Sequence, residues 1–128
     1  MARILVVDDD PLFLRIITFM LHRNHHSVVT TDSVKDALAI LADQPIDIVF
    51  VDINIPGMSG ISLLDQLRAD DRYANLPVVI LTASAWRRDR SRALRRGATA
   101  FLHKPASSWE LNETVSRLSP AALSAAQI

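Results

Sequence analysis

The sequence predicts an α/β layered fold, in which helices cover both faces of a parallel β-sheet. Five short apolar runs alternate with five longer amphipathic runs, and such βα alternation is typical of parallel strands joined by right-handed crossovers. The second, third and fourth apolar runs lack polar alternation apart from Asp47, which indicates strands buried on both faces. The chain has 128 residues, enough for one domain with a core but hardly for two.

The five predicted strands are short runs rich in Val, Ile, Leu and Thr, the residue types that favour a pleated and buried surface. In chain order they cover residues 3–7, 27–31, 46–51, 77–81 and 98–103.

The five predicted helices show apolar residues at helical spacing and have recognisable ends. Pro11 suits a first helical turn, and Asp10 before it is a typical N-cap. Ser33 with Asp36 resembles a capping box with Asp in place of Glu, and Gly97 stands where a left-handed C-cap belongs. In chain order the helices cover about residues 11–23, 33–42, 59–70, 85–96 and 107–118.

Composition narrows the class of protein. Apolar residues make up 49% and charged residues 22%, as in globular domains. The absence of cysteine excludes disulfides, thiolate zinc sites and cysteine nucleophiles, and fits a reducing compartment. No uncharged stretch approaches the roughly 20 residues of a membrane helix, and the start of the chain reads as a strand rather than a signal peptide. We therefore expect a cytoplasmic location, a single domain over residues 1–119, and a flexible tail over residues 120–128.

Charge is balanced overall but unevenly spread. Residues 1–64 carry four basic and eight acidic side chains, and residues 65–128 carry ten basic and six acidic ones. The zero net charge argues against nucleic-acid binding in bulk, and we expect no direct DNA binding. The predicted fourth helix leaves two interpretations open, a solvated face and an interaction surface. Its candidate interface residues are Trp86, Arg87, Arg88, Arg92, Arg95 and Arg96.

Polar residues follow four separate strands at the point where each strand ends. Asp8 to Asp10 follow the first strand, Asp52 the third, Thr82 the fourth and Lys104 the fifth. Because the carboxyl ends of parallel strands share one edge of a sheet, we expect these groups to converge there. Buried acids need compensation, and Mg²⁺ prefers oxygen ligands. A lysine beside them suggests that an anionic phosphoryl group visits the site.

These residues carry a family resemblance. The chain resembles a response-regulator receiver domain of two-component signal transduction, of the kind found in chemotaxis regulators. The matching segments are Val7-Asp8-Asp9, Asp52-Ile53-Asn54-Ile55-Pro56-Gly57, Leu81-Thr82-Ala83 and Lys104-Pro105. The resemblance implies a flavodoxin-like (βα)5 three-layer sandwich with strand order 2-1-3-4-5, and a cis peptide before Pro105.

The resemblance also implies a role for each site residue. Asp52 would be the phosphoacceptor. Asp9 and Asp52 would hold Mg²⁺, or Mn²⁺ as a substitute, together with the backbone carbonyl of Asn54, and Asp8 would act through metal-bound water or as a partial ligand. Thr82, with Ala83 and Lys104, would bind the phosphoryl group, and Thr82 would form a switch pair with Phe101.

The implied function is regulatory rather than enzymatic. The phosphoryl donor would be a sensor histidine kinase or a histidine phosphotransfer protein. The output would be a downstream protein or a fused domain, reached through the fourth helix, fifth strand and fifth helix. Asn54 and Ser84 would tune the phosphoryl lifetime. We expect no membrane association and a monomer, with dimerisation on phosphorylation left open.

Three alternatives bear on this interpretation. The module can stand alone or be part of a longer transcription factor, hybrid kinase or enzyme. An aspartate-based phosphatase needs a second acid two residues after its nucleophile, where Asn54 stands instead. His22, His25 and His26 lie together in sequence, and we favour surface loop histidines over metal ligands. At Ala106 the chain departs from the family, in which Phe is frequent after the Lys-Pro pair.

Overall fold

A computed structural model describes residues 1–84 and 86–119 of the chain. Its five strands are β1 (Arg3–Val7), β2 (Ser27–Thr31), β3 (Ile48–Val51), β4 (Val78–Thr82) and β5 (Ala100–His103). They form one parallel sheet in the order β2-β1-β3-β4-β5. The expected strand order is therefore confirmed.

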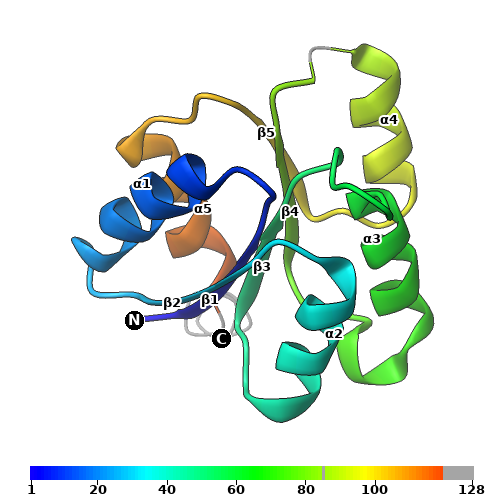
Figure 1. Ribbon diagram of the computed structural model, residues 1–128, viewed down its shortest axis with the longest axis horizontal. Coiled ribbons are helices and arrows are strands. Elements are labelled where there is room, and N and C mark those ends of the chain that lie inside the picture. Colours follow the sequence, from blue (N-terminus) through cyan, green and yellow to red (C-terminus); the bar gives the residue numbers. More distant parts are fainter. Residues whose placement is uncertain (85, 120–128) are drawn as a thin grey trace.

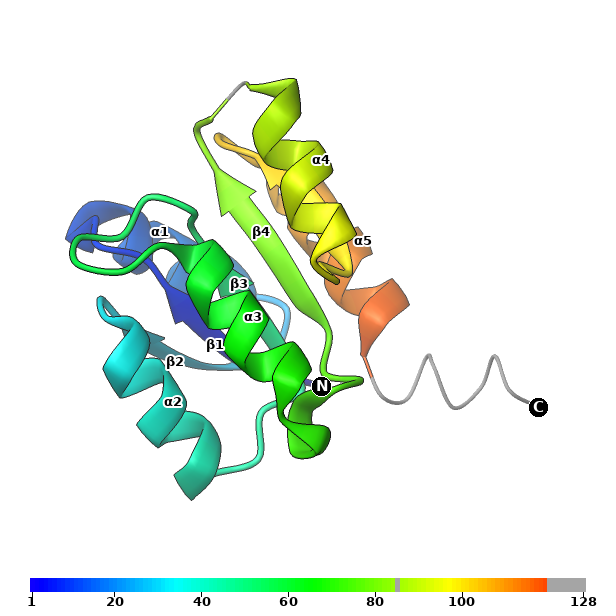
Figure 2. The same ribbon diagram turned by 90° about the vertical axis from the view of Figure 1, so that its right-hand side faces the viewer.

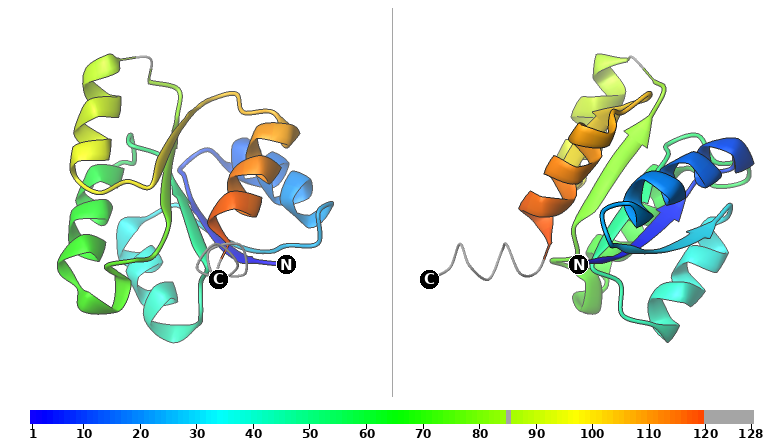
Figure 3. Two further views of the ribbon diagram at one scale, coloured as in Figure 1. Left: turned by 180° about the vertical axis from the view of Figure 1, so that it is seen from behind. Right: turned by 90° about the vertical axis from the view of Figure 1, so that its left-hand side faces the viewer.

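Five α-helices and a 3₁₀ turn connect the strands. They are α1 (Pro11–His22), α2 (Val34–Asp43), α3 (Gly60–Ala69), η1 (Asp71–Tyr73), α4 (Arg87–Arg95) and α5 (Ser108–Leu118). Helices α1 and α5 cover one face of the sheet, and α2, α3 and α4 cover the other (Figure 1). The three layers are also clear when the molecule is turned (Figures 2 and 3). The predicted tail, residues 120–128, and the predicted helix start at Ala85 lie outside the described residues.

The core has two parts, one on each face of the sheet. Alternate residues of each strand point to opposite faces, so Leu5 and Val49 pack under α2 and α3, whereas Ile4 and Phe50 pack under α1 and α5. Every residue of β3 and β4 is buried, which explains why these strands show no polar alternation in the sequence. The prediction of burial on both faces was wrong for the second strand, because β2 lies at the edge of the sheet and none of its residues is buried.

The helix ends follow the predicted chemistry with one difference. Asp10 caps α1, and Gly97 adopts a left-handed backbone with φ of +99°. The Ser33 side chain accepts from the Asp36 N–H at 3.0 Å, but the Ser33 N–H donates to Thr31 Oγ1 at 3.4 Å rather than to Asp36. Asp is one methylene shorter than Glu, so only half of the predicted capping box forms. A complete box forms in α5, between Ser107 and Glu110.

Candidate functional site

Register places the polar residues of four strand ends beside one another. Val7 pairs with Val51 in neighbouring strands, so the residues that follow, Asp8 and Asp52, lie side by side. Thr82 pairs with His103, which brings Lys104 to the same edge of the sheet. The predicted convergence therefore occurs in the fold, at the carboxyl ends of the strands.

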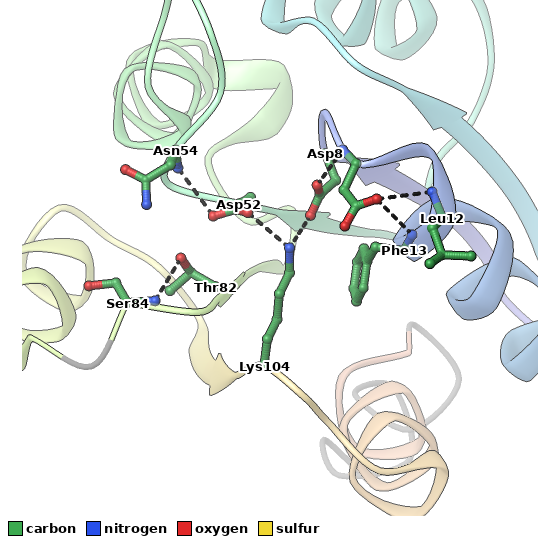
Figure 4. A network of polar contacts seen from close by, with 9 residues as sticks. Asp8, Leu12, Phe13, Asp52, Asn54, Thr82, Ser84 and Lys104 are labelled. Atoms are coloured by element: carbon green, nitrogen blue, oxygen red, sulfur yellow. Dashed lines mark hydrogen bonds and ion pairs between the residues drawn. The ribbon is translucent and has the colours of Figure 1, made fainter.

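Lys104 is the centre of this arrangement. Its ammonium lies 2.5 Å from Asp8 Oδ2 and 2.9 Å from Asp52 Oδ2 (Figure 4). The side chain of Lys104 is only 15% exposed, and both carboxylates are more deeply buried than that. Buried charges need compensation by close partners, and here one cation compensates two acids.

Backbone N–H groups fix the remaining carboxylate oxygens. The Asp10 N–H donates to Asp8 Oδ1 at 2.9 Å, and the Asn54 N–H donates to Asp52 Oδ1 at 3.1 Å. Each buried carboxylate is thus held by one backbone donor and one ammonium. Their orientation is set before any ligand binds.

Burial and ion pairing have opposite net effects on the charged forms of Asp8 and Lys104. Burial raises the pKa of Asp8 above its ordinary value of 3.8, because the hydrogen bonds from Lys104 and Asp10 offset the desolvation only in part. Burial alone would lower the pKa of Lys104, but its hydrogen bonds to Asp8 and Asp52 outweigh that effect, so this pKa is raised above 10.5. Lys104 therefore stays charged while Asp8 bears a cost for its charge.

Three carboxylates lie close enough to share a cation. One oxygen from each of Asp8, Asp9 and Asp52 lies within 4.8 Å of the other two. Asp8 and Asp52 are buried and Asp9 is exposed, so the cluster opens to solvent on one side. Hard carboxylate oxygens with an open side suit Mg²⁺, which keeps several waters when bound. The donor set therefore fits the metal that the sequence predicts.

The β4–α4 loop carries the next two predicted residues. Thr82 is completely buried at the end of β4, and its Oγ1 accepts from the Ser84 N–H at 3.3 Å. The Thr82 hydroxyl proton is therefore free to be donated elsewhere. The Ser84 Oγ donates to Asp89 Oδ2 in α4, while Ala83 between them is exposed. This loop links the site directly to α4.

Comparison with known proteins identifies the family. Residues 4–116 match the family described as the response regulator receiver domain. The chain belongs to this family. Protein PilH of Pseudomonas aeruginosa is 34% identical over 115 residues, covering 90% of this chain and 95% of PilH. Response regulator PleD of Caulobacter vibrioides is 38% identical over 104 residues, covering 81% of this chain but 23% of PleD.

Solved structures of receiver domains have the same fold as this chain. The chemotaxis protein CheY4 of Vibrio cholerae superposes with a TM-score of 0.86 and 27% identity, over 92% of this chain and 98% of that one. The receiver domain of a sensor histidine kinase from Pseudomonas aeruginosa has a TM-score of 0.84 and 28% identity, over 91% and 96% of the two chains. That structure holds a magnesium ion in its active-site cleft. The receiver domain thus recurs in short proteins and as a part of longer ones.

Asp10 plays a structural role in this receiver domain. Its Oδ1 accepts from the N–H groups of Leu12 and Phe13, at 3.0 and 3.3 Å. This is the capping role that the sequence favours over metal ligation for Asp10. The Lys104–Pro105 peptide is cis, as the resemblance implies.

Two contributors to the receiver site were missed in the sequence. The Lys104 ammonium lies 4.1 Å from the centre of the Phe13 ring, a cation–π contact. A Cβ at Gly60 would come within 2.0 Å of the Asp52 backbone oxygen, so only glycine lets α3 begin this close to Asp52. The only sequence signals were that Gly60 is a small residue at a helix start and that Phe13 is an aromatic residue three positions after an N-cap. Each signal is weak alone.

Of the three neighbouring histidines, His22 ends α1 and His26 has a structural contact. His26 Nδ1 accepts from the Ala2 N–H at 3.0 Å, and burial lowers the pKa of His26 below 6.5. Within residues 1–84 and 86–119, the metal-competent cluster is the acidic one and includes no histidine. The helices of this described part are all too short or too polar to cross a membrane.

The candidate interface residues lie in α4 or directly beside its ends. Trp86 is 69% exposed, and the arginines of α4 are exposed as well. Phe101, on β5, is half-buried and packs against the core beneath α3 and α4. Phe101 also lines a cavity together with Trp86 and Arg87.

Proposed function

We propose that this receiver domain accepts a phosphoryl group on Asp52 from a phosphohistidine donor and signals by protein contact. The observation that carries the proposal is the paired arrangement at Asp52, with a lysine ammonium on one oxygen and two further carboxylates beside it. A carboxylate nucleophile, a cation for the incoming anion and a metal cluster are the parts that phosphoryl transfer requires.

The metal-binding residues in this proposal are Asp8, Asp9 and Asp52, with the backbone carbonyl of Asn54. Bound Mg²⁺, or Mn²⁺ in its place, would neutralise charge on the phosphoryl oxygens and lower the repulsion between this anion and the acidic cluster. Asp9 is the exposed member of the cluster and offers the first ligand to an arriving cation.

The transfer itself involves few protein groups. A carboxylate oxygen of Asp52 attacks phosphorus while the phosphorus–nitrogen bond breaks, and the departing imidazole keeps the electron pair and takes a proton from solvent. Lys104 exchanges its hydrogen bond to Asp52 for one to a phosphoryl oxygen. The free hydroxyl proton of Thr82 and the N–H of Ala83 would serve the other oxygens. The chain would catalyse only its own phosphorylation and dephosphorylation.

The switch in this proposal follows from Thr82. When Thr82 turns toward the phosphoryl group, its contact with the Ser84 N–H breaks and the β4–α4 loop is released. Phe101 then has room to move inward from its half-buried position. The outcome is a changed surface over α4, β5 and α5, and Asn54 and Ser84, which flank the phosphoryl position, tune how long it persists.

The phosphodonor has an apolar surface on which to rest beside the site. Leu12 and Phe19 are each 63% exposed on α1, and Ile16 between them completes an apolar stripe at helical spacing. The stripe begins next to Phe13, whose ring contacts the Lys104 ammonium. A donor helix lying on this stripe would bring its phosphohistidine to Asp52.

The partners and setting follow from the family. We propose a sensor histidine kinase or histidine phosphotransfer protein as donor, and a downstream protein or fused domain as target. A cytoplasmic location fits the absence of cysteine and the need for Mg²⁺.

Phosphorylation with acetyl phosphate and Mg²⁺, mapped by mass spectrometry, tests the assignment. We expect one phosphoryl group per chain on Asp52, and none in Asp52→Asn, which keeps the carboxamide in the same space. Asp36→Asn, a neutralised acid outside the site, is the matched control and should label normally. A label on Asp8 or Asp9, or full labelling of Asp52→Asn, would overturn the assignment.

Movement of the β4–α4 loop can be measured separately by tryptophan fluorescence. In a Trp109→Phe background, Trp86 is the only remaining tryptophan. We expect its fluorescence to change when beryllofluoride and Mg²⁺ occupy the site, because the β4–α4 loop precedes it. An unchanged spectrum, with binding confirmed by calorimetry, would contradict a mobile loop.

A further inference from the structure

Helix α4 concentrates positive charge on one small part of the surface. Five of its nine residues are arginine, and Arg96 follows directly. The only acid in the helix is Asp89, whose carboxylate accepts from the Ser84 hydroxyl. Asp89 is therefore engaged by the β4–α4 loop.

Most of this charge has no counter-charge in the described structure. Arg96 forms an ion pair with Asp65 at 2.6 Å, and the Arg95 Nε donates to the Ser91 carbonyl. Within residues 1–84 and 86–119, four arginine side chains of α4 form neither an ion pair nor a hydrogen bond. They are Arg87, Arg88, Arg90 and Arg92.

A cavity adjoins two of these arginines. It measures about 270 Å³ and lies between the start of α4 and β5. Two aromatic side chains, Trp86 and Phe101, and two guanidinium groups, those of Arg87 and Arg90, contribute to its lining. Ser84 and His103 complete it. Such a cavity suits an apolar side chain that has carboxylates on either side.

We propose that this surface, made of the cavity and the four unpaired arginines, binds an acidic segment of a partner protein. The partner's apolar side chain fills the cavity, and its carboxylates pair with the guanidinium groups, which bind carboxylates in a bidentate manner. Arginine and aromatic residues are the side chains that contribute most at protein interfaces. The inference rests on the proposed function, because it gives the chemistry of the output partner.

A protein segment fits better than a nucleic acid. The four unpaired arginines fall within residues 87–92, about 8 Å of helix at 1.5 Å rise per residue, which spans few phosphates. The strand-end carboxylates lie beyond the same end of β4 that leads into α4, and they would repel a long polyanion. The zero net charge of the chain adds no general attraction.

Residues that line the cavity also connect this surface to the phosphoacceptor site. Ser84 contacts Thr82 by one atom and Asp89 by another, and Phe101 is the expected switch residue. Occupancy of Asp52 therefore alters the cavity, and the affinity for the acidic segment changes with it.

Fluorescence anisotropy with a labelled synthetic peptide tests the proposal. The probe is a peptide of about twelve residues carrying four glutamates around a central leucine, with glutamine and serine versions as controls. Arg87→Gln with Arg90→Gln should weaken binding by about fivefold or more. Arg72→Gln with Arg117→Gln removes the same charge elsewhere and should leave binding nearly unchanged, with thermal melts verifying that both variants fold.

Several outcomes would overturn the proposal. The two double variants could bind the glutamate peptide equally well, or the wild type could bind the glutamine peptide as tightly as the glutamate peptide. A single-stranded oligonucleotide could bind more tightly than the peptide, or beryllofluoride could leave the affinity for the peptide unchanged. Phosphorylation of Asp52 in the Arg87→Gln and Arg90→Gln variant is measured in parallel. If Asp52 is labelled while the peptide fails to bind, the partner assignment fails and the phosphoacceptor function stands.

Discussion

Asp8 illustrates the cost of assembling this site from single residues. It is 1% exposed, and the raised pKa shows that burial of its charge is compensated only in part. A group that folding makes harder to ionise reduces the stability of the folded state at neutral pH. Asp8 therefore lowers the stability of the folded state, a cost that its proposed role in metal binding would explain.

Asp8→Asn should stabilise the metal-free protein. The amide keeps an acceptor for the Asp10 N–H and removes the buried charge, while Lys104 retains Asp52. We expect the melting temperature to rise by a few degrees, the size of a change of about 1 kcal/mol in a domain of this length. The same variant should lose most of the stabilisation that Mg²⁺ gives to the wild type, and Asp36→Asn should leave this Mg²⁺ effect unchanged.

The stability difference between Asp8→Asn and the wild type should depend on pH. Because the folded-state pKa of Asp8 is raised above 3.8, the wild type regains the missing stability as pH falls through that raised value. The gap is then widest near neutral pH and narrows in acid. Denaturant titrations across this range measure it, and a gap that widened in acid would contradict the raised pKa.

The site residues that could be predicted from the sequence are those that stand at the ends of predicted strands. Asp8, Asp52, Thr82 and Lys104 follow apolar runs, so parallel strands alone bring them together. Phe13 contacts Lys104, and Gly60 adjoins the Asp52 backbone. Both contacts join residues that are not neighbours in the chain, so no local sequence pattern predicts them. The chemical roles of the site residues remain predictions until labelling is done.

At the scale of elements, the helices differ in how firmly the fold holds them. Helix α3 buries five of its ten residues, whereas α4 buries only Ala93. The helix that begins against the Asp52 backbone is thus firmly packed, and the helix of the proposed output surface is not. Weakly packed elements are the ones that open and move most readily.

Gly60→Ala should damage both the fold and the site. The added Cβ meets a backbone atom, which cannot turn aside as a flexible side chain would, so α3 or the Asp52 carbonyl must shift. We expect a loss of about 2 kcal/mol or more, with slower phosphorylation of the protein that remains folded. Gly57→Ala is the control for backbone strain alone. Gly57 has φ of +85°, but an added Cβ there would have nothing within 4 Å. A normal phosphorylation rate in Gly60→Ala would count against this positioning role.

Element ends were harder to predict than element types. Strand β3 begins at Ile48 rather than at residue 46, because the Asp47 carboxylate turns to accept from the Arg3 N–H at 2.8 Å. The η1 turn lacks apolar periodicity and depends on the Asp70 cap, so it was not predicted. Both depend on side chains that bond to the backbone locally or across strands.

At the scale of the whole molecule, Lys104 ties three strands together. Its ammonium bonds to residues that follow β1 and β3, at separations of 96 and 52 residues along the chain. The strand order that permits this came from the family resemblance, because composition and periodicity do not specify which parallel strands are neighbours. The fold class, by contrast, followed from alternation alone.

Lys104→Met should destabilise the metal-free protein by about 3 kcal/mol, because two buried carboxylates lose their counter-charge. Mg²⁺ should then stabilise the variant by more than it stabilises the wild type, since the cation replaces the missing positive charge. Lys35→Met on the exposed face of α2 is the matched control. Thermal melts with and without Mg²⁺ measure both effects, and equal destabilisation by the two variants would argue against a role for Lys104 as counter-ion.

The burial of Lys104 has a practical consequence for chemical labelling. The chain contains only two lysines, and Lys35 is exposed whereas Lys104 is enclosed with a raised pKa. An amine-reactive reagent needs an accessible, uncharged amine, so under mild conditions it should acylate Lys35 and the amino terminus and spare Lys104. A fluorophore or surface anchor can therefore be attached at Lys35 while the Lys104 ammonium stays unmodified.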